Sequence, residues 1–413
     1  MSEIGGEIHQ VRNNYAHHLM YYNTYFPFLL FECFNKISLA LKEAKTKEEE
    51  IGKNIYKIVD FEKKTSYVSF TCHSFISCSD MDSIPRDGHI ILIKFDSNLK
   101  SKSDSMLGYV CSSATRAYSH KFDYNHEMLE YVSVNTRTDL RKVRIIFFTV
   151  FDISEINRNT PIRISKLTNV KKTLMLNDAL SELQRSPLCN VILNPQSHNI
   201  KSIVLPRKQD TDAMTTIVQA IVNPLNISSP QMAIVVSGPF TDSLSAIVQV
   251  VEDIKKSKIP GKILVCVRAE MLSQMGMGLI ETSNNLLIIN REKEFLHNKL
   301  QGRVLDEMIP FMPNAQNRQN DEAKRKVLQE AEVLLTVTGT CFYKDVQDMV
   351  RDLSYCIIHD AHNFTEPESL LPLLYGIKHL ILFGDPNEPC HASSKCAASF
   401  GYKSLFHRVC NSC

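Results

Sequence analysis

The spacing of hydrophobic positions changes several times along the chain. Residues 15–44 are apolar at helical spacing and run into a charged stretch at 42–53, which predicts a helix followed by a solvated connector. From 54 to 153 the pattern changes to short β-rich runs that polar, turn-forming segments separate. This pattern predicts a small β-barrel or sandwich. Helical periodicity returns over residues 167–185.

Beyond about residue 200 the apolar positions form continuous runs without alternation. The expected strands are AIVVS (233–237), KILVC (262–266), LLIIN (286–290), EVLLTV (332–337), YCIIH (355–359) and HLILF (379–383). The expected helices between them are 245–256, 293–308, 321–331 and 342–352. Strands that are buried on both faces and joined by helices indicate a parallel sheet covered on both sides, which is an α/β fold.

Composition restricts the class of protein. The 413 residues predict about two to three domains, and 44% hydrophobic with 22% charged residues is typical of a globular chain. Lys and Arg exceed Asp and Glu by 47 − 45 = 2, so any nucleic-acid surface is expected to be local. The 14 glycines are about half the usual ~7%, which leaves little material for glycine-rich phosphate loops. Every apolar run is shorter than the roughly 18–20 residues that cross a bilayer, so we expect an intracellular protein without a membrane partner.

The segments that follow the predicted strands are the candidate sites, because ligands of such sheets bind at the carboxyl ends of the strands. GPFTDSLS (238–245) follows the first of these strands, at the place of a nucleotide-binding P-loop. HDAHNFTEPESLLPL (359–373) follows YCII, and GDPNEP (384–389) follows HLILF.

Two further segments complete a resemblance to a known family. TEPESLLPLLYGIKHLILFGDP (365–386) and KSLFHR (403–408) resemble the first RecA-like lobe of superfamily 1 helicases of the Sen1/Upf1 type. LPRKQ (205–209) resembles the glutamine-containing segment before the P-loop of that family, which makes Gln209 the candidate adenine reader. The resemblance implies a RecA-like P-loop NTPase fold preceded by a helical stalk and a small β-barrel, with Mg-ATP as the cofactor of an active member.

The resemblance also implies a domain organisation. Residues 1–53 correspond to an N-terminal helical stalk region and 54–160 to a β-barrel accessory domain. Residues 161–204 form a stalk helix and linker, and 205–413 form the first RecA-like lobe. The family places a prong-like insertion at about 284–330, for which a surface loop is the alternative.

The segment at the P-loop position departs from the family. In a working P-loop, glycines let backbone N–H groups wrap the phosphates, a lysine neutralises phosphate charge, and Ser or Thr holds Mg²⁺. Gly238, Pro239 and Ser245 match the family, whereas Leu244 replaces the lysine. The remaining departures are Thr241 and Ser243 at glycine positions and Asp242 between them. Without phosphate binding, the segment is an ordinary strand–turn–helix junction in which Ser243 caps the helix.

The acidic motif departs as well. The family uses an Asp in the Mg²⁺ shell and a following Glu that positions the attacking water. The spacing to TEPE puts His359 at the Asp position and Asp360 at the Glu position; a shift of one residue would leave Ala361 at the Glu position. In GDPNEP, Asp385 matches the family, but Glu388 replaces the glutamine that senses the γ-phosphate.

These departures predict a module without ATP chemistry. The family's second RecA lobe supplies an arginine finger, and we expect none of it here. The favoured hypothesis is a degenerate helicase module with no intact catalytic residues and no cofactor, which binds RNA, single-stranded DNA or a protein. One alternative is an ATP-dependent helicase subunit whose second lobe another chain supplies, with Mg-ATP bound. Another is a scaffold that binds only proteins.

Five basic residues are candidates for a nucleic-acid path beside the barrel. They are Lys171, Lys172, Arg207, Lys208 and Arg268, with solvated surface charge as the alternative for each. HDAH (359–362) could supply a pair of metal ligands, and the alternative is an acidic motif that has lost its metal-binding residues. We favour the alternative and expect no metal site. The resemblance favours the nucleus over the cytoplasm, and the oligomeric state stays open.

Overall fold

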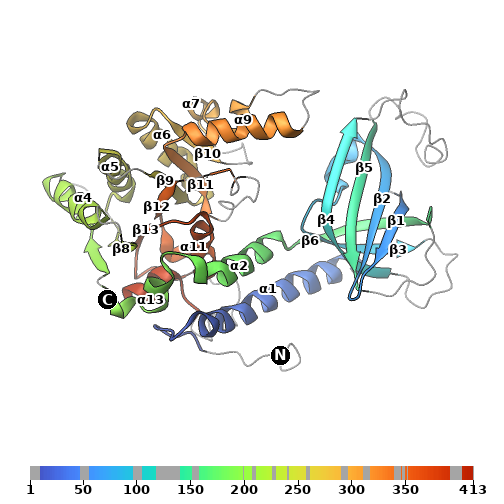
Figure 1. Ribbon diagram of the computed structural model, residues 1–413, viewed down its shortest axis with the longest axis horizontal. Helices are drawn as coiled ribbons and strands as arrows, with labels where there is room; N and C mark the ends of the chain where they lie inside the picture. Colours follow the sequence, from blue (N-terminus) through green and yellow to red (C-terminus); the bar gives the residue numbers. More distant parts are fainter. Residues whose placement is uncertain are drawn as a thin grey trace. The chain divides into compact units, whose positions relative to one another are not determined.

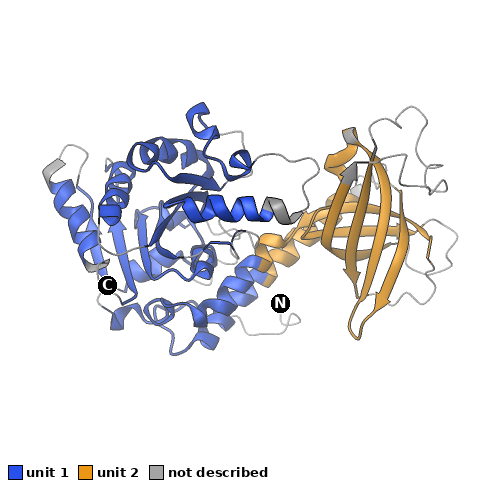
Figure 2. Ribbon diagram, turned by 45° about the horizontal axis from the view of Figure 1, so that its top comes forward, with its two compact units in different colours: residues 1–29, 175–413 blue, residues 30–174 orange. Residues whose placement is uncertain are grey.

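The computed structural model places two compact units along the chain. One unit combines residues 1–29 with 175–413, and the other comprises residues 30–174 (Figure 2). The described residues are 10–46, 55–95, 105–117, 140–150, 158–198, 200–206, 211–225, 229–239, 241–256, 261–289, 296–309, 317–338, 346, 349–350, 352–390 and 402–412.

The unit of residues 30–174 contains a closed antiparallel barrel, which confirms the predicted small β-barrel (Figure 1). Its strand order is β1-β2-β5-β4-β3-β6. The strands are β1 (Ile55–Lys63), β2 (Val68–Ser77), β3 (His89–Phe95), β4 (Ser105–Ala117), β5 (Leu140–Thr149) and β6 (Pro161–Asn169), and a 3-10 helix η3 (Cys78–Ser83) follows β2.

Alternate residues of the barrel strands fill its interior. Tyr56 and Ile58 of β1 are fully buried, and the rings of Phe70 and Phe147 stack with centroids 5.2 Å apart. Gly108 on β4 lies so close to this interior that an added Cβ would meet the Phe147 ring at 3.1 Å. The period of two in the sequence therefore corresponds to side chains that alternate between the core and the outer face.

The other unit contains a seven-stranded sheet in the described part of the chain. Its order is β10-β11-β9-β12-β13-β8-β7, and every neighbouring pair is parallel, as the sequence predicts. The strands are β7 (Lys201–Val204), β8 (Gln231–Val236), β9 (Lys262–Val267), β10 (Leu286–Ile289), β11 (Val333–Val337), β12 (Leu353–Ile358) and β13 (His379–Gly384).

Helices cover both faces of this sheet (Figure 1). On β9, Leu264 and Cys266 join one apolar cluster, whereas Ile263 and Val265 join the other. In the part of the chain that the structure describes, the helices with four or more residues are α1 (His18–Thr46), α2 (Lys171–Glu182), α3 (Cys189–Leu193), α4 (Thr211–Leu225), α5 (Ser243–Lys256), α6 (Leu272–Thr282), α7 (Asn298–Gln301), α8 (Leu305–Met308), α9 (Asn317–Glu330), α11 (Glu366–Leu370) and α13 (Leu405–Cys410). The 3-10 helices of this unit are η6 (Leu183–Arg185), η7 (Pro195–Ser197), η8 (Ala269–Met271), η11 (Ala361–Asn363) and η12 (Leu371–Tyr375). Helices α4, α5 and α6 contribute to the cluster of Ile263, and α1, α9 and α13 contribute to the cluster of Leu264.

One predicted helix is wrong as a continuous element. The described part of 293–308 holds two single-turn helices, α7 and α8, separated at Gly302. The chain returns to the sheet here, because Val304 forms a parallel bridge with Ile288 of β10 and is 2% exposed. Burial of Val304 at the sheet edge outweighs the helical propensity of the segment. Most of the predicted helix 342–352 lies outside the described residues.

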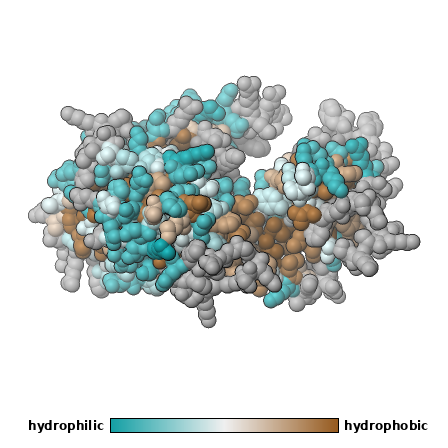
Figure 3. All heavy atoms as spheres, turned by 60° about the horizontal axis from the view of Figure 1, so that its bottom comes forward, coloured by the Kyte–Doolittle hydropathy of each residue, from teal (hydrophilic) through white to brown (hydrophobic). Residues whose placement is uncertain are grey.

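Helix α1 keeps several apolar side chains at the surface. Leu19, Phe34 and Leu39 are 60%, 56% and 60% exposed, and Figure 3 shows apolar side chains gathered on one face of the molecule. In the described residues, no helix combines the length and the hydropathy needed to cross a membrane.

Candidate functional site

Asp242 precedes helix α5, caps its N-terminus and accepts a hydrogen bond from the hydroxyl of Ser245. The Ser245 backbone N–H donates to Asp242 Oδ1 at 3.0 Å, and the Ser245 hydroxyl donates to Asp242 Oδ2 at 2.9 Å. The carboxylate therefore satisfies a free N–H group at the positive end of the helix dipole. The expectation that Ser243 caps the helix is wrong, because Ser243 is its first residue.

The hydroxyl of Ser243 instead reaches the acidic motif. Its Oγ lies 3.0 Å from Nε2 of His359, which follows β12. His359 is 3% exposed, and its Nδ1 lies 3.5 Å from Oδ2 of Asp360. Burial lowers the pKa of His359, with opposing effects from the charges of Asp360 and Arg268. The position for which the resemblance implies a metal-binding carboxylate is thus held by a buried imidazole that burial keeps neutral.

Asp360 is engaged by Arg268, which follows β9. The Arg268 Nη2 and Nε atoms lie 3.1 and 3.2 Å from Asp360 Oδ2, and Arg268 Nη1 lies 2.6 Å from Glu270 Oε1. Asp360 has a left-handed backbone with φ of 53°, which Asp adopts more readily than most residues. Because β9 and β12 are neighbours in the sheet, their carboxyl ends bring the two charges together. The one acidic side chain retained in HDAH is therefore half of an ion pair.

Leu244 faces the helical layer. It packs with the apolar cluster of α5 and α6, and an added Cβ on Gly278 would lie 3.6 Å from Leu244 Cδ2. An added Cβ on Gly238 would meet no atom within 4 Å, so the space beside the loop backbone is open. Pro239 is exposed at the same turn. The backbone of Gly238 is thus open on one side, whereas the side chain of Leu244 contributes an apolar contact to the protein interior.

Asp385 and Glu388 form a turn after β13. The backbone N–H of Asp385 donates to His362 Nδ1 at 3.1 Å, and Asp385 Oδ1 accepts from the backbone and side chain of Asn387 at 2.9 and 3.1 Å. Glu388 is exposed, and its backbone carbonyl lies 2.9 Å from His407 Nε2. Both residues thus have clear structural contacts within the lobe.

Some predicted residues lie apart or outside the described chain. Gln209, Arg207 and Lys208 are outside the described residues. Lys171 and Lys172 are exposed at the start of α2, in the unit of residues 30–174. Arg268 lies beside the acidic motif, where it pairs with Asp360.

Sequence reasoning missed a buried ion pair between Glu366 and Arg408, which are 0% and 1% exposed. Arg408 Nη2 donates to Glu366 Oε1 at 2.6 Å, and Arg408 Nε lies 2.9 and 3.0 Å from the two carboxylate oxygens. Tyr21 and Tyr25 of α1 donate their hydroxyls to the same carboxylate at 2.7 and 2.5 Å. Burial, followed by the charge of Glu366, raises the pKa of both tyrosines well above the usual value, so they remain donors.

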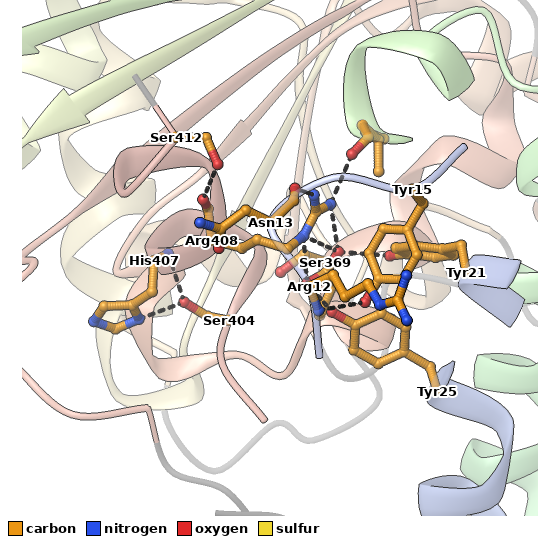
Figure 4. Close-up of polar contacts among 12 residues, drawn as sticks. Arg12, Asn13, Tyr15, Tyr21, Tyr25, Ser369, Ser404, His407, Arg408 and Ser412 are labelled. Carbon is orange, nitrogen blue, oxygen red and sulfur yellow. Dashed lines mark hydrogen bonds and ion pairs between the residues drawn. The ribbon is translucent and has the colours of Figure 1, made fainter. Parts of the chain in front are cut away.

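Arg408 also lies beside Asn13 of the N-terminal segment (Figure 4). It donates to the backbone carbonyls of Asn13 and Ile192, each at 2.7 Å. Its guanidinium lies 5.6 Å from the ring centroid of Tyr15 and 5.7 Å from that of Tyr21. A single side chain therefore links the N-terminal segment, α3 and the TEPE motif.

The TEPE motif begins helix α11 with a capping box. The Thr365 backbone N–H and hydroxyl lie 2.8 and 2.9 Å from Glu368 Oε2, and Pro367 occupies the first turn. This cap orients Glu366 into the interior. The sequence of the motif is typical of a helix start. Arg408, the buried partner of Glu366, is 42 residues away in the sequence.

Comparisons with known proteins find similarities to parts of this chain. The profile of a family described as AAA domain matches residues 280–388. Helicase sen1 of Schizosaccharomyces pombe is 36% identical over 90 residues, which are 21% of this chain and 5% of that protein. The UvsW helicase of bacteriophage T4 aligns with 59% of this chain and 58% of its own at 12% identity, with a TM-score of 0.25. The chain thus spans only a small part of the length of the helicase sen1 that it resembles.

Proposed function

From the premise that the chain carries a Sen1/Upf1-like superfamily 1 helicase module, we propose that this module is catalytically inactive and acts by binding single-stranded nucleic acid. The observation that carries the proposal is the bond between the Ser245 hydroxyl and Asp242. In a working P-loop this hydroxyl is a Mg²⁺ ligand. Here it donates to a carboxylate that already occupies the anion-binding end of α5.

The residues present do not fit Mg-ATP. Asp242 places negative charge where phosphates bind, and Leu244 supplies no positive charge in return. A lysine–phosphate pair at 4 Å contributes at most about 4 kcal/mol at an effective dielectric constant near 20. His359 contacts Ser243, and Asp360 pairs with Arg268, so no carboxylate of HDAH is left for the metal shell. We therefore derive no step of ATP hydrolysis.

Titration of a fluorescent ATP analogue with Mg²⁺ tests the inactive state. We expect no binding at millimolar nucleotide and no ATP hydrolysis, with or without RNA. The matched variant Ser245→Ala removes the hydroxyl at the metal position and should leave both results unchanged. RNA-stimulated hydrolysis that Ser245→Ala abolishes would show that the module is an active ATPase.

The nucleic-acid part of the proposal is supported by the relative's activity, because a helicase acts on nucleic acid. The expected signature is binding of single-stranded RNA or DNA that weakens steeply as salt rises, since phosphate contacts release counterions. Fluorescence anisotropy at several salt concentrations measures it. Absent binding, or affinity that salt leaves unchanged, would favour a scaffold that binds proteins.

A further inference from the structure

Three side chains of the sheet unit form a line of polar groups at the start of helix α5. Ser243 Oγ lies 3.0 Å from His359 Nε2, and His359 Nδ1 lies 3.5 Å from Asp360 Oδ2. All three residues belong to the unit of residues 1–29 and 175–413, so the arrangement needs no contribution from the barrel. A hydroxyl, an imidazole and a carboxylate in this order are the groups that activate a serine nucleophile.

The carboxylate of Asp360 selects the tautomer of His359. An ionised carboxylate only accepts hydrogen bonds, so a proton on Nδ1 faces it favourably, whereas a bare nitrogen lone pair there is repelled. Among the described residues, the buried Nδ1 makes no hydrogen bond, which leaves this electrostatic contact to decide the tautomer. With the proton on Nδ1, Nε2 is the acceptor, and the Ser243 hydroxyl is the donor of the 3.0 Å bond.

Arg268 holds Asp360 in this role. The Arg268 Nη2 and Nε atoms lie 3.1 and 3.2 Å from the same Oδ2 atom. The positive charge favours the ionised carboxylate, and two contacts from one planar guanidinium fix its position. Burial lowers the pKa of His359, so the imidazole is neutral near pH 7 and can accept a proton. The base and the group that orients it are thus both in the charge state that nucleophile activation requires.

The position of Ser243 in the fold also suits a nucleophile. Ser243 is half-buried and is the first residue of α5, which follows β8 after a turn. A strand–turn–helix junction is where serine hydrolases of the α/β class carry their nucleophile. The backbone N–H groups of Ser243 and Leu244 lie in the first turn, where a helix offers no acceptor of its own. Such donors stabilise the negative oxygen that forms when a serine attacks a carbonyl group.

We propose that Ser243 is the nucleophile of an esterase site for small carboxylic esters, with His359 as general base and Asp360 as its positioning residue. Ser243 Oγ bonds to the carbonyl carbon while its proton moves to His359 Nε2. The same proton passes to the leaving alcohol as the ester bond breaks, and water then hydrolyses the acyl-serine by the same route. The reaction uses no nucleotide and goes beyond the proposed function, in which inactivity refers to ATP hydrolysis.

The neighbouring Ser245 provides a matched control. It lies in the same helical turn, but its hydroxyl donates to Asp242 Oδ2 at 2.9 Å. No imidazole contacts Ser245 within the described part of the chain. A difference in reactivity between the two serines therefore reports the contact of Ser243 with His359.

A fluorophosphonate probe, which reacts with activated serines, tests the site on the full chain. Ser243 Oγ bonds to phosphorus, fluoride leaves, and the hydroxyl proton goes to His359, so the adduct is stable. Peptide mass spectrometry identifies the modified residue, and we expect Ser243 and not Ser245. Hydrolysis of p-nitrophenyl acetate should fall at least about 100-fold in Ser243→Ala, since general-base catalysis contributes about 10²–10⁴-fold. Ser245→Ala should leave it unchanged.

Asp360→Asn tests the positioning role. The amide can donate to His359 Nδ1, which favours the tautomer that cannot accept the Ser243 proton. We expect kcat for p-nitrophenyl acetate to fall at least about tenfold while KM stays unchanged. An unchanged kcat in a folded Asp360→Asn variant would contradict the assignment of Asp360.

The mapping experiment uses the unmodified chain, so it does not depend on how well Ser243→Ala folds. No adduct, or an adduct only on another residue, would overturn the inference once thermal unfolding shows that the chain is folded. RNA binding by the same preparation is a separate measurement. Its absence would contradict the proposed function and leave an adduct on Ser243 standing.

Discussion

Ser243 and His359 lie 116 residues apart in the sequence, yet the Ser243 Oγ and His359 Nε2 atoms are 3.0 Å apart. The contact ties the first turn of α5 to the carboxyl end of β12. These two elements form the walls of the nucleotide site in a P-loop fold, where a metal ion usually connects them. In this chain a hydrogen bond connects them directly.

Removing this hydrogen bond should destabilise the lobe. Ser243→Ala leaves a nitrogen of the buried His359 ring without its partner, which costs about 1–3 kcal/mol. Chemical denaturation measures the free energy of unfolding. Ser245→Ala is the control, since water can replace the bond of this exposed serine to Asp242. Equal effects of the two substitutions would contradict a specific role for the His359 contact.

Restoring the lysine alone should not restore nucleotide binding. Leu244→Lys adds a charge, but Asp242 still holds the Ser245 hydroxyl and still repels phosphate. We expect no binding of the fluorescent ATP analogue at millimolar concentration.

A second variant tests which residues of the loop prevent nucleotide binding. Thr241→Gly/Asp242→Thr/Ser243→Gly/Leu244→Lys rebuilds the family's loop and should bind the analogue without hydrolysing ATP, because His359 remains. Binding by Leu244→Lys alone at the level of the fourfold variant would show that Asp242 does not block the site.

The buried pair of Glu366 and Arg408 should be a large contributor to stability. Arg408→Met removes one partner and leaves an uncompensated buried carboxylate, which typically costs about 3–5 kcal/mol. Arg185→Met breaks the exposed pair with Glu182 and should cost less than about 1 kcal/mol. Urea titration compares the two variants.

If Arg408→Met does not fold, substitutions that remove less of the network still allow free energies of unfolding to be compared with that of Arg185→Met. Tyr21→Phe and Tyr25→Phe each remove one hydroxyl donor from Glu366 while retaining the ring. We expect each to cost about 1.5–3 kcal/mol, as for a hydrogen bond to a charged group. A cost no greater than that of Arg185→Met for all three variants would mean that the pair does not hold α1 on the lobe.

Lowering the pH should destabilise the protein over a pH range that the pKa of His379 helps to define. Burial, with a smaller effect of Lys378, lowers the pKa of His379 to about 4, and its ring stacks on Tyr355 with centroids 4.9 Å apart. In the unfolded chain the pKa of a histidine is about 6.5. Between these values the unfolded state binds the proton and the folded state does not, so stability falls as pH is lowered from about 6.5 to 4.

The variant His379→Phe isolates this contribution. It should reduce the slope of unfolding free energy against pH in that window by up to about 1.4 kcal/mol per pH unit, the value for one proton. Urea titrations at a series of pH values measure the slope. An unchanged slope would mean that the His379 ring is protonated at similar pH in both states.

The sequence predicted the strands of the sheet because their burial is a local property. HLILF at 379–383 is continuously apolar, and the corresponding β13 is buried along its whole length between two helical layers. The β-rich texture of 54–153 likewise predicted the barrel, since alternation reports which side chains face the interior. The predicted helix at 293–308 failed because contact of Val304 with the sheet edge interrupts it.

Only the tertiary structure decided which residues meet. The substitutions at Leu244 and His359 are visible in the sequence by resemblance, but the pairing of Ser243 with His359 and of Arg268 with Asp360 depends on how the ends of β8, β9 and β12 converge. The same holds for Glu366 with Arg408. Periodicity describes the neighbours of a residue within one element, whereas these contacts depend on strand order and register between elements that are distant in the sequence.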